Sequence, residues 1–289
     1  MTLPQEIVGA KYEARVGVLK DYDNVWDAQV DVWHGRVDAA SQKAIFAAAQ
    51  RPHTPLDFVY LTEKTTAEQL NAYELLFYPH MTIVTEKQAE LLKEYVAAGG
   101  TLVIGCRSGY KDATGQCVME NLPGLLSRLT GTDIPEYSFI APDAGRVTID
   151  WDGTELEASI FADLLEPLPG AHLEGTYTAD YYAGAGALVS NTYGKGRAYY
   201  YGSAFCESTA RIFLEKLGAC APYRDVISLP ESCELAVRSK GENRYLFVLN
   251  YEKTPAQITL HKEALDLYTR KPVTGNITLE GYGTLVLKL

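Results

Sequence analysis

The chain has 289 residues, of which 47% are hydrophobic and 22% charged, a composition typical of a folded protein with one core of moderate size and a smaller second one. Its 37 acidic and 26 basic residues give a formal net charge of −11, which opposes binding to nucleic acid or to an anionic membrane. No segment is long and apolar enough to span a bilayer, and the N-terminal sequence lacks the regions of a secretion signal, so we predict a cytoplasmic protein.

Strands and helices alternate over the first third of the chain. The sequence ARVGVLKDYD is predicted to be a strand that runs into an acidic loop at Asp21–Asp31. Thr85 and Gln88 have the spacing of a capping box, and Gly99–Gly100 ends the helix that follows them. Such alternation is typical of a parallel sheet with helices on both faces. We predict strands at 14–23, 56–61, 74–79 and 101–106, and helices at 38–51, 65–73 and 85–98.

The pattern changes after Trp151. We predict a helix at 154–167, a hairpin at 186–204 around a Gly-Lys-Gly turn, and a closing helix at 207–219. The glycine-rich turn is not a phosphate-binding loop, because such loops open helices and this one joins two strands. Beyond Pro222 only short alternating runs remain, which predicts a small antiparallel sandwich.

Five cysteines are spread along the chain without any Cys-x-x-Cys pair. Their odd number and wide spacing favour free, mostly buried thiols over a disulfide framework or a zinc knuckle. The histidines are equally scattered, and no two have metal-ligand spacing. We therefore expect neither a metal nor a cofactor.

A cysteine at the end of a predicted strand could be a nucleophile, because ligands of parallel sheets meet the carboxyl ends of the strands. In glutamine amidotransferases the thiolate stands on an elbow with glycines two residues before and two after it. Around Cys106 those places hold Ile104 and Ser108. His172 and Glu174 have the spacing of catalytic partners, but their segment alternates as a strand does. We expect Cys106 to be a small buried apolar residue.

Twenty tyrosines are many for this length, and the runs DYY and AYYYG could stack against sugars. Tyrosines in strands more often pack and present their hydroxyls at an edge or interface, which is the interpretation we favour. Carboxylates are abundant, but spacing alone assigns no pair as the acid and the nucleophile of a glycosidase.

Four stretches share a specific order and spacing: VGVLKDYDNVWDAQ, the segment from Tyr95 to Gly131 with its Arg-Ser-Gly-x-Lys-Asp loop, DYYAGAGALVSNTYGKGRAYYYGS, and YLFVLNY with LEGYGTLVLKL. In this order they resemble the middle and C-terminal domains of the glycoside hydrolase family 42 β-galactosidases. The likeness covers nearly the whole chain. It implies an amidotransferase-like (flavodoxin-like) parallel sheet with helices on both faces, followed by a small antiparallel β-sandwich.

The resemblance also implies a domain organisation. The parent enzymes have an (α/β)₈ barrel that holds both catalytic glutamates, then a trimerisation domain, then a small β-domain. We expect residues 1–13 to be a linker from a barrel that this chain lacks, 14–222 to be the trimerisation domain, and 223–289 the β-domain. A retaining glycosidase needs two carboxyl groups held about 5 Å apart in a rigid pocket, and a barrel needs about 250 residues. We therefore expect no catalytic residue and no hydrolysis of β-D-galactosides by this chain alone.

By the same resemblance, the chain associates three subunits or binds a barrel domain, and walls the entrance of a neighbouring active site. We predict contacts from Asp23, Asn24 and Trp26 in one segment and from Arg107, Lys111 and Asp112 in another, since Trp and Arg most often anchor interfaces. The alternative is that Arg107 and Asp112 only pair across their own loop. Two other functions stay open: a free-standing amidotransferase-like hydrolase with Cys106 as nucleophile, and a sugar-binding module.

Overall fold

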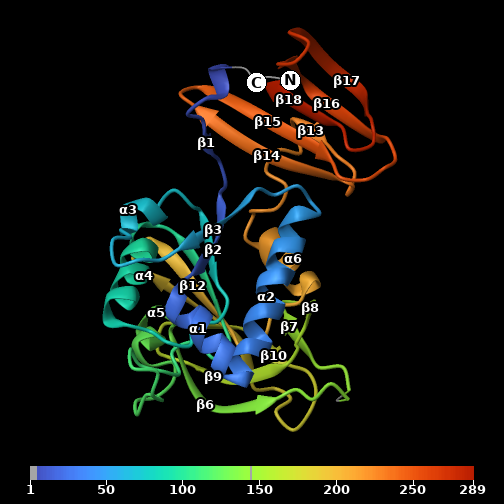
Figure 1. The fold of residues 1–289 in the computed structure, drawn as a ribbon. Helices are drawn as coiled ribbons and strands as arrows, with labels where there is room; N and C mark the ends of the chain where they lie inside the picture. Colours follow the sequence, from blue (N-terminus) through green and yellow to red (C-terminus); the bar gives the residue numbers. More distant parts are fainter. Residues whose placement is uncertain (1–4, 144) are drawn as a thin grey trace.

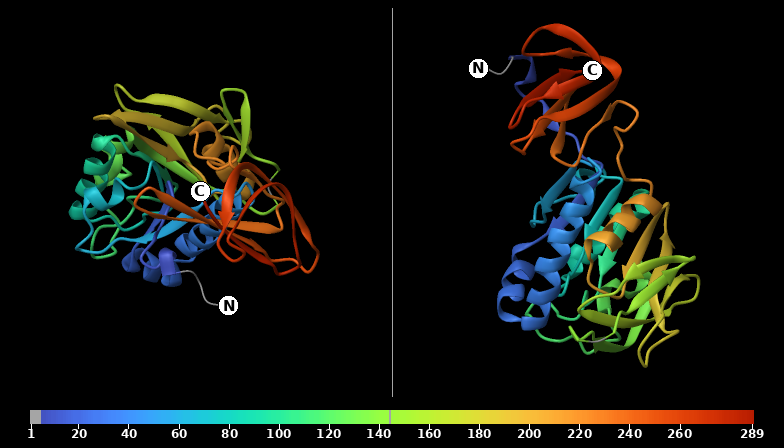
Figure 2. Two further views of the ribbon diagram at one scale, coloured as in Figure 1. Left: turned by 90° about the horizontal axis from the view of Figure 1, so that it is seen from above. Right: turned by 90° about the vertical axis from the view of Figure 1, so that its right-hand side faces the viewer.

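The computed structural model describes residues 5–143 and 145–289, which form two separate β-sheets. Figure 1 shows a large sheet surrounded by helices and, at one end of the molecule, a smaller antiparallel sheet. The right-hand view of Figure 2 shows the smaller sheet standing clear of those helices, so the molecule is elongated. An α/β unit followed by an antiparallel β unit confirms the predicted fold class.

The large sheet is mixed, with five parallel strands at one side and antiparallel strands at the other. The parallel strands have the order β3-β2-β4-β5-β12, in which the first of them in the chain lies between the second and the third, as in flavodoxin-like folds. They are β2 (Val16–Lys20), β3 (Leu56–Tyr60), β4 (Leu75–Tyr78), β5 (Thr101–Gly105) and β12 (Gly196–Tyr201). The antiparallel strands are β11 (Gly186–Tyr193), β10 (His172–Tyr177), β7 (Thr148–Trp151) and β8 (Thr154–Glu157), joined by β6 (Thr132–Phe139) and β9 (Phe161–Pro167).

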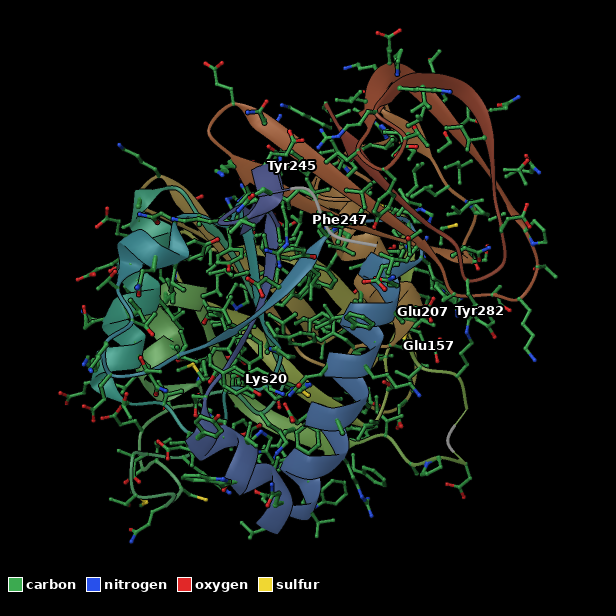
Figure 3. All side chains as sticks on the ribbon, turned by 45° about the horizontal axis from the view of Figure 1, so that its top comes forward. Lys20, Glu157, Glu207, Tyr245, Phe247 and Tyr282 are labelled. Atoms are coloured by element: carbon green, nitrogen blue, oxygen red, sulfur yellow. The ribbon has the colours of Figure 1, made fainter. Side chains whose placement is uncertain are left out.

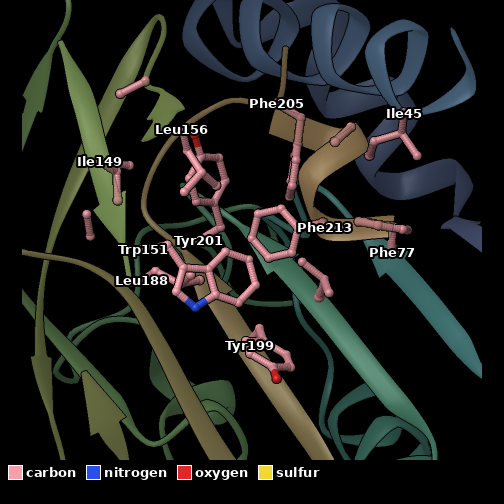
Figure 4. Packing of buried hydrophobic residues seen from close by; sticks show 14 of the residues in the cluster. Ile45, Phe77, Ile149, Trp151, Leu156, Leu188, Tyr199, Tyr201, Phe205 and Phe213 are labelled. Carbon is pink, nitrogen blue, oxygen red and sulfur yellow. The ribbon is translucent and has the colours of Figure 1, made fainter. Parts of the chain in front are cut away.

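Helices cover both faces of the parallel strands, as predicted. On one face, α2 (Val32–Gln50) and α6 (Glu207–Lys216) contribute Ile45 and Phe213 to a shared core. On the other face lie α3 (Ala67–Leu70), α4 (Glu86–Ala98) and α5 (Ser127–Thr130), the last of them directly after the 3₁₀ helix η2 (Gly124–Leu126). Figure 4 shows the first core, where the Phe213 ring contacts Trp151 and also the rings of Tyr201 and Phe205.

The tyrosine run AYYYG belongs to this packing and not to a sugar platform. Tyr200 and Tyr201 in β12 are fully buried, and Tyr199 is only 5% exposed. The favoured interpretation of these residues, that they pack within the sheet, is therefore confirmed.

Several local predictions are confirmed and three are wrong. The capping box of Thr85 and Gln88 and the Gly99 stop bound α4, and the hairpin of β11 and β12 turns at Gly194 and Lys195. The acidic segment after β2 is a helix, α1 (Tyr22–Val30), and not a loop, and α2 begins at Val32 and not at residue 38. Residues 154–167 form the strands β8 and β9 and no helix.

The smaller sheet has seven antiparallel strands and its own core. Strand β1 (Lys11–Tyr12), inside the segment we predicted as a linker, pairs with β14, and Ile7 of the 3₁₀ helix η1 (Gln5–Ile7) packs with Tyr245. Figure 3 labels Tyr245 and Phe247 on this sheet. The other strands are β13 (Ile227–Ser228), β14 (Cys233–Lys240), β15 (Asn243–Asn250), β16 (Ala256–Asp266), β17 (Lys271–Leu279) and β18 (Thr284–Lys288).

None of the helices in the described ranges is both long and apolar enough to cross a bilayer. The domain boundaries after residues 13 and 222 stay predictions.

Candidate functional site

The two segments in which we predicted contacts meet at the carboxyl ends of the parallel strands. Arg107 Nη2 lies 3.0 Å from Asp31 Oδ2, and Lys111 Nζ lies 2.8 Å from the same oxygen. Lys111 Nζ also lies 2.7 Å from Asp27 Oδ1. Arg107 therefore pairs with a residue 76 positions away, and the alternative that it pairs with Asp112 in its own loop is wrong.

This charge network is balanced in sign and shielded from solvent. The side chains of Arg107 and Lys111 are 10% and 13% exposed, and those of Asp27 and Asp31 are 9% and 16% exposed. Burial alone would raise the pKa of Asp31, but hydrogen bonds from Lys111 and the His34 backbone and the charge of Arg107 lower it to about 2. Asp31 is thus ionised at neutral pH, and its charge is matched inside the chain. The network is suited to bracing the structure and not to acid–base catalysis.

Asp31 also connects α1 to α2. Its backbone N–H donates to the Asp27 carbonyl at the end of α1, at 2.7 Å. Its Oδ1 caps α2 by accepting from the backbone N–H groups of Trp33 and His34, at 2.9 and 3.1 Å. The His34 ring is fully buried between Asp27 Oδ2, at 2.8 Å, and the carbonyl oxygen of His80, at 3.2 Å. Polar contacts therefore fix the helix pair to the loops after β4 and β5.

Asn24 fills the crevice between the carboxyl ends of β2 and β4. Its Nδ2 donates to the Ile83 carbonyl oxygen at 2.9 Å, and its Oδ1 accepts the Ile83 N–H at 2.8 Å. Its Nδ2 also donates to Asp21 Oδ2 at 2.9 Å. The strand order reverses at this point, where sheets of this type usually bind ligands. Here α1 occupies the crevice, so Asn24 holds that helix in place.

Arg107, and not the cysteine before it, stands on a glycine-flanked elbow after β5. Its φ is 60°, a left-handed conformation that costs energy for any residue with a Cβ. A Cβ on Gly105 would lie 2.1 Å from the Pro79 carbonyl oxygen, and one on Gly109 would lie 2.0 Å from that of Pro123. Both positions therefore require glycine. The turn has the pattern of a nucleophile elbow, with a guanidinium where the nucleophile would stand.

A buried carboxylate from β9 anchors this elbow. Asp163 Oδ2 accepts from the Arg107 N–H at 2.9 Å and from the Tyr200 hydroxyl at 2.8 Å, and Oδ1 accepts from the Tyr110 hydroxyl at 2.6 Å. Asp163 has no exposed surface. Burial raises its pKa to about 6, even though these three hydrogen bonds favour the ionised form.

Cys106 has a histidine neighbour that the sequence analysis did not predict. Its Sγ lies 3.7 Å from His80 Nδ1, but that nitrogen donates to the Cys106 carbonyl oxygen at 2.7 Å. The other ring nitrogen accepts from Ser41 Oγ at 2.7 Å. Burial raises the pKa of the Cys106 thiol well above its usual value and lowers that of His80 to about 3. A neutral thiol beside a neutral imidazole, both sealed from solvent, provides no thiolate nucleophile.

The remaining predicted residues lie at the surface of the same edge. Trp26 is 60% exposed, and Asp23 is exposed beside it on α1. Asp112 accepts from the Thr114 N–H at 2.8 Å and from the Gln116 N–H at 3.2 Å, which shapes its own loop. Within residues 5–143 and 145–289, no group of three or more His, Cys, Asp or Glu side chains is arranged to hold a metal ion.

The sequence analysis does not identify Asp31, which pairs with Arg107 and Lys111, or Asp163, which accepts from the Arg107 N–H. For each of them the sequence holds a feature that could have predicted its role. Asp163 is a lone carboxylate inside the apolar run FADLL, and such a residue needs buried donors. Asp31 stands at the start of an apolar helical pattern, where Asp is a preferred cap.

Two protein-family models match the chain. Residues 14–221 match the β-galactosidase trimerisation domain, and residues 233–289 match the β-galactosidase C-terminal domain. Together these matches take in α1, the elbow and the whole charge network.

Known β-galactosidases match most of the chain. The β-galactosidase Pbg of Clostridium perfringens is 27% identical over 294 residues, which cover 98% of this chain and 42% of that protein. The β-galactosidase BgaA of Clostridium cellulovorans is 30% identical over 228 residues, covering 77% of this chain and 34% of that protein.

Solved β-galactosidase structures also match nearly the whole chain. A catalytic mutant of a GH42 β-galactosidase from G. stearothermophilus matches with a TM-score of 0.85 at 26% identity, covering 98% of this chain and 41% of that one. The β-galactosidase from Bacillus circulans sp. alkalophilus matches with a TM-score of 0.84 at 25% identity, covering 98% of this chain and 42% of that one. The chain thus spans about 42% of the length of such relatives.

Proposed function

The chain belongs to the glycoside hydrolase family 42 β-galactosidases as a C-terminal module of that family, and on this premise we propose that its role is to assemble subunits and not to catalyse. The observation that carries the proposal is the match of residues 14–221 to the family's trimerisation domain. We propose three copies in the assembly, in keeping with the name of that domain.

The geometry of the carboxyl edge supports a role without catalysis. At the place where a related sheet would hold a nucleophile, Arg107 is tied to Asp31 and its backbone to Asp163. The charges of Asp27 and Lys111 are likewise matched inside the chain. An edge whose polar groups are paired within the chain in this way is rigid. A rigid surface loses little conformational entropy when it binds another subunit.

The parent enzyme, in this proposal, hydrolyses terminal β-D-galactosides with retention of configuration, using catalytic glutamates of a barrel domain. The present chain meets the galactoside only by walling the entrance of a neighbouring active site. The residues we propose for these contacts are Asp23 and Trp26 on α1 and Asp112 on the loop after β5. Asn24, Arg107 and Lys111 hold the two segments in position.

We also propose a cytoplasmic location. All five cysteines are free thiols, and reduced thiols are typical of proteins in that compartment. Cell fractionation of the native host, with a blot against the chain, tests this; recovery in the membrane or secreted fraction would contradict it.

Sedimentation velocity of the purified 289-residue chain tests the assembly role. Three copies of a 31.8 kDa chain give a particle of about 95 kDa. We expect that particle at micromolar concentration, together with no turnover of a nitrophenyl β-galactoside. A monomer at every concentration and salt level would refute assembly, and robust turnover would refute the non-catalytic role.

A further inference from the structure

Helix α1 turns three large apolar side chains outward and two polar side chains inward. Tyr22, Trp26 and Val30 are 56%, 60% and 81% exposed, and their spacing of four residues places them in one stripe along the helix. The opposite side of the helix contributes the buried amide of Asn24 and the paired carboxylate of Asp27. This is the reverse of the usual surface helix, whose apolar side faces the core.

The stripe continues beyond the helix. The Tyr22 ring stacks on Tyr60 of β3 with centroids 5.3 Å apart, and it lies 5.8 Å from the Trp26 ring. Tyr60 is 44% exposed, and Val32, at the start of α2, is 65% exposed. Strand β3 is at the edge of the large sheet, so the surface joins a helix to an open strand edge. In Figure 1, α1 lies in the half of the α/β unit that is farther from the smaller sheet.

The stripe contributes little to the fold of a single chain. The helix is held by its polar contacts, through Asn24 to Ile83 and through Asp27 to Lys111. Its aromatic and aliphatic side chains remain largely in water, where they lower solubility. Contiguous exposed aromatic and aliphatic groups on a rigid helix are typical of the centre of a protein interface.

We propose that this surface, made of Tyr22, Trp26, Val30, Val32 and Tyr60, docks onto a second copy of this chain. The inference rests on the proposed assembly function and names the surface that carries it.

The charges around the stripe favour a second copy as the partner. Each chain carries a net charge of −11, so copies repel one another over most of their surface. At the stripe, the carboxylates beneath it are neutralised by Arg107 and Lys111. Its border presents both signs: Asp23 on α1, and Lys20, whose ammonium lies 5.7 Å from the Tyr60 ring centre. An acidic copy can therefore approach here with an acidic group opposite Lys20 and a basic group opposite Asp23.

A double substitution, Trp26→Glu with Val30→Glu, tests the surface in the full chain. The matched control is Tyr282→Glu, since Tyr282 is 62% exposed and lies in the turn between β17 and β18 of the smaller sheet; Figure 3 labels it well apart from Lys20. We expect sedimentation velocity to show the control assembling as the wild type does. We expect the double variant to associate about 10- to 100-fold more weakly, because two central anchors are lost and like charges are added. Raising the ionic strength should strengthen wild-type association, because it screens the repulsion between acidic copies.

The outcomes separate this inference from the proposed function. If the wild type assembles and the double variant assembles equally well, the docking surface lies elsewhere and the inference fails, while the assembly role stands. If the wild type never assembles, both fail. Should the double variant lose its circular dichroism signal, acrylamide quenching of tryptophan fluorescence in the wild type gives a second test, because Trp26 is 60% exposed and is accessible to the quencher, whereas Trp151 is 4% exposed. Quenching must fall on assembly; a signal that is the same in dilute and concentrated samples would refute the surface.

Discussion

The backbone N–H of Arg107 donates to the Asp163 carboxylate at 2.9 Å, and this bond joins the elbow after β5 to a strand 56 residues further along the chain. The elbow is strained, with a non-glycine residue at a φ of 60°. In an enzyme of this fold, such strain would present a nucleophile. Here it presents a guanidinium to Asp31, and the site that could have been reactive becomes a point of attachment for α1 and α2.

At position 107 we predict that the glycine variant is more stable than the alanine variant, which is the reverse of the usual order. Arg107→Ala and Arg107→Gly both lose the ion pair with Asp31 and the contacts with the Tyr110 and Phe161 rings, so both are less stable than the wild type. Glycine, however, adopts a positive φ without strain, and we expect the glycine variant to be the more stable of the two by about 0.5–1 kcal/mol. Urea unfolding measures the difference.

The matched control for that comparison is Arg36, which lies inside α2. There the ordinary ranking applies, and Arg36→Gly should be less stable than Arg36→Ala by about 1 kcal/mol. If both sites gave the same ranking, the left-handed elbow would not exist in solution.

The buried carboxylate predicts an unusual dependence of stability on pH. Burial raises the pKa of Asp163 from its usual value of 3.8 to about 6 in the folded chain, so the folded state binds a proton more tightly than the unfolded state does. The stability that this proton gives is fully present below pH 4 and is lost as the pH rises to 6. Relative to Asp163→Asn, which cannot titrate, the wild type should gain up to about 3 kcal/mol between pH 7 and pH 4. Chemical unfolding of both chains across this range measures the gain, and parallel curves would rule out a titrating Asp163.

The elements that could be predicted from sequence are those whose local signals agree with their packing. Helix α4 has its capping box and terminal glycine, and its apolar residues Leu92 and Val96 face the core. The sequence does not predict helix α1, because Tyr22, Trp26 and Val30 face solvent and not the core. The acidic residues that follow strand β2 are more typical of a loop. The run Phe161–Leu165 was mistaken for a helix because every one of its residues is buried, and such a run carries no alternation that would distinguish a strand.

The site was only partly predictable, for a different reason. That the two segments meet at one edge follows from the predicted parallel sheet, since the carboxyl ends of parallel strands lie together. The partners of Arg107 and Lys111 could not be found, because Asp27 and Asp31 are distant in sequence and belong to a helix that was not predicted. The sequence analysis tests for an elbow centred on Cys106, but the glycines at positions 105 and 109 are centred on Arg107.

Two substitutions of Asp31 separate its bracing role from its capping role. Asn caps a helix as well as Asp does, so Asp31→Asn removes mainly the charge shared by Arg107 and Lys111. We expect a loss of about 2 kcal/mol, less than for a fully buried pair because the side chain is 16% exposed. Asp31→Ala also loses the bonds to the Trp33 and His34 N–H groups and should cost about 1 kcal/mol more.

The pH dependence of Asp31 should run opposite to that of Asp163. Its folded pKa is lowered to about 2, so the stability it gives is present above pH 4 and disappears as the pH falls toward 2. The difference in unfolding free energy between the wild type and Asp31→Asn should therefore shrink in that window. A difference that is constant from pH 6 to pH 2 would show that the carboxylate is not held in its charged form.

Thiol mapping tests whether the amidotransferase-like edge has any nucleophile. Cys117 is exposed, whereas Cys106 and Cys233 are buried, and burial raises the pKa of both buried thiols. We expect iodoacetamide to label Cys117 in the native chain and to label Cys106 and Cys233 only after denaturation, as read by peptide mass spectrometry. Cys106→Ala should leave the mass of the assembled particle unchanged, because the thiol contacts no other subunit in the proposed interface. Labelling of native Cys106 at a higher rate than Cys117 would mean that the elbow opens to solvent and carries a reactive thiol. Hydrolysis would then replace assembly as the function we propose for this edge.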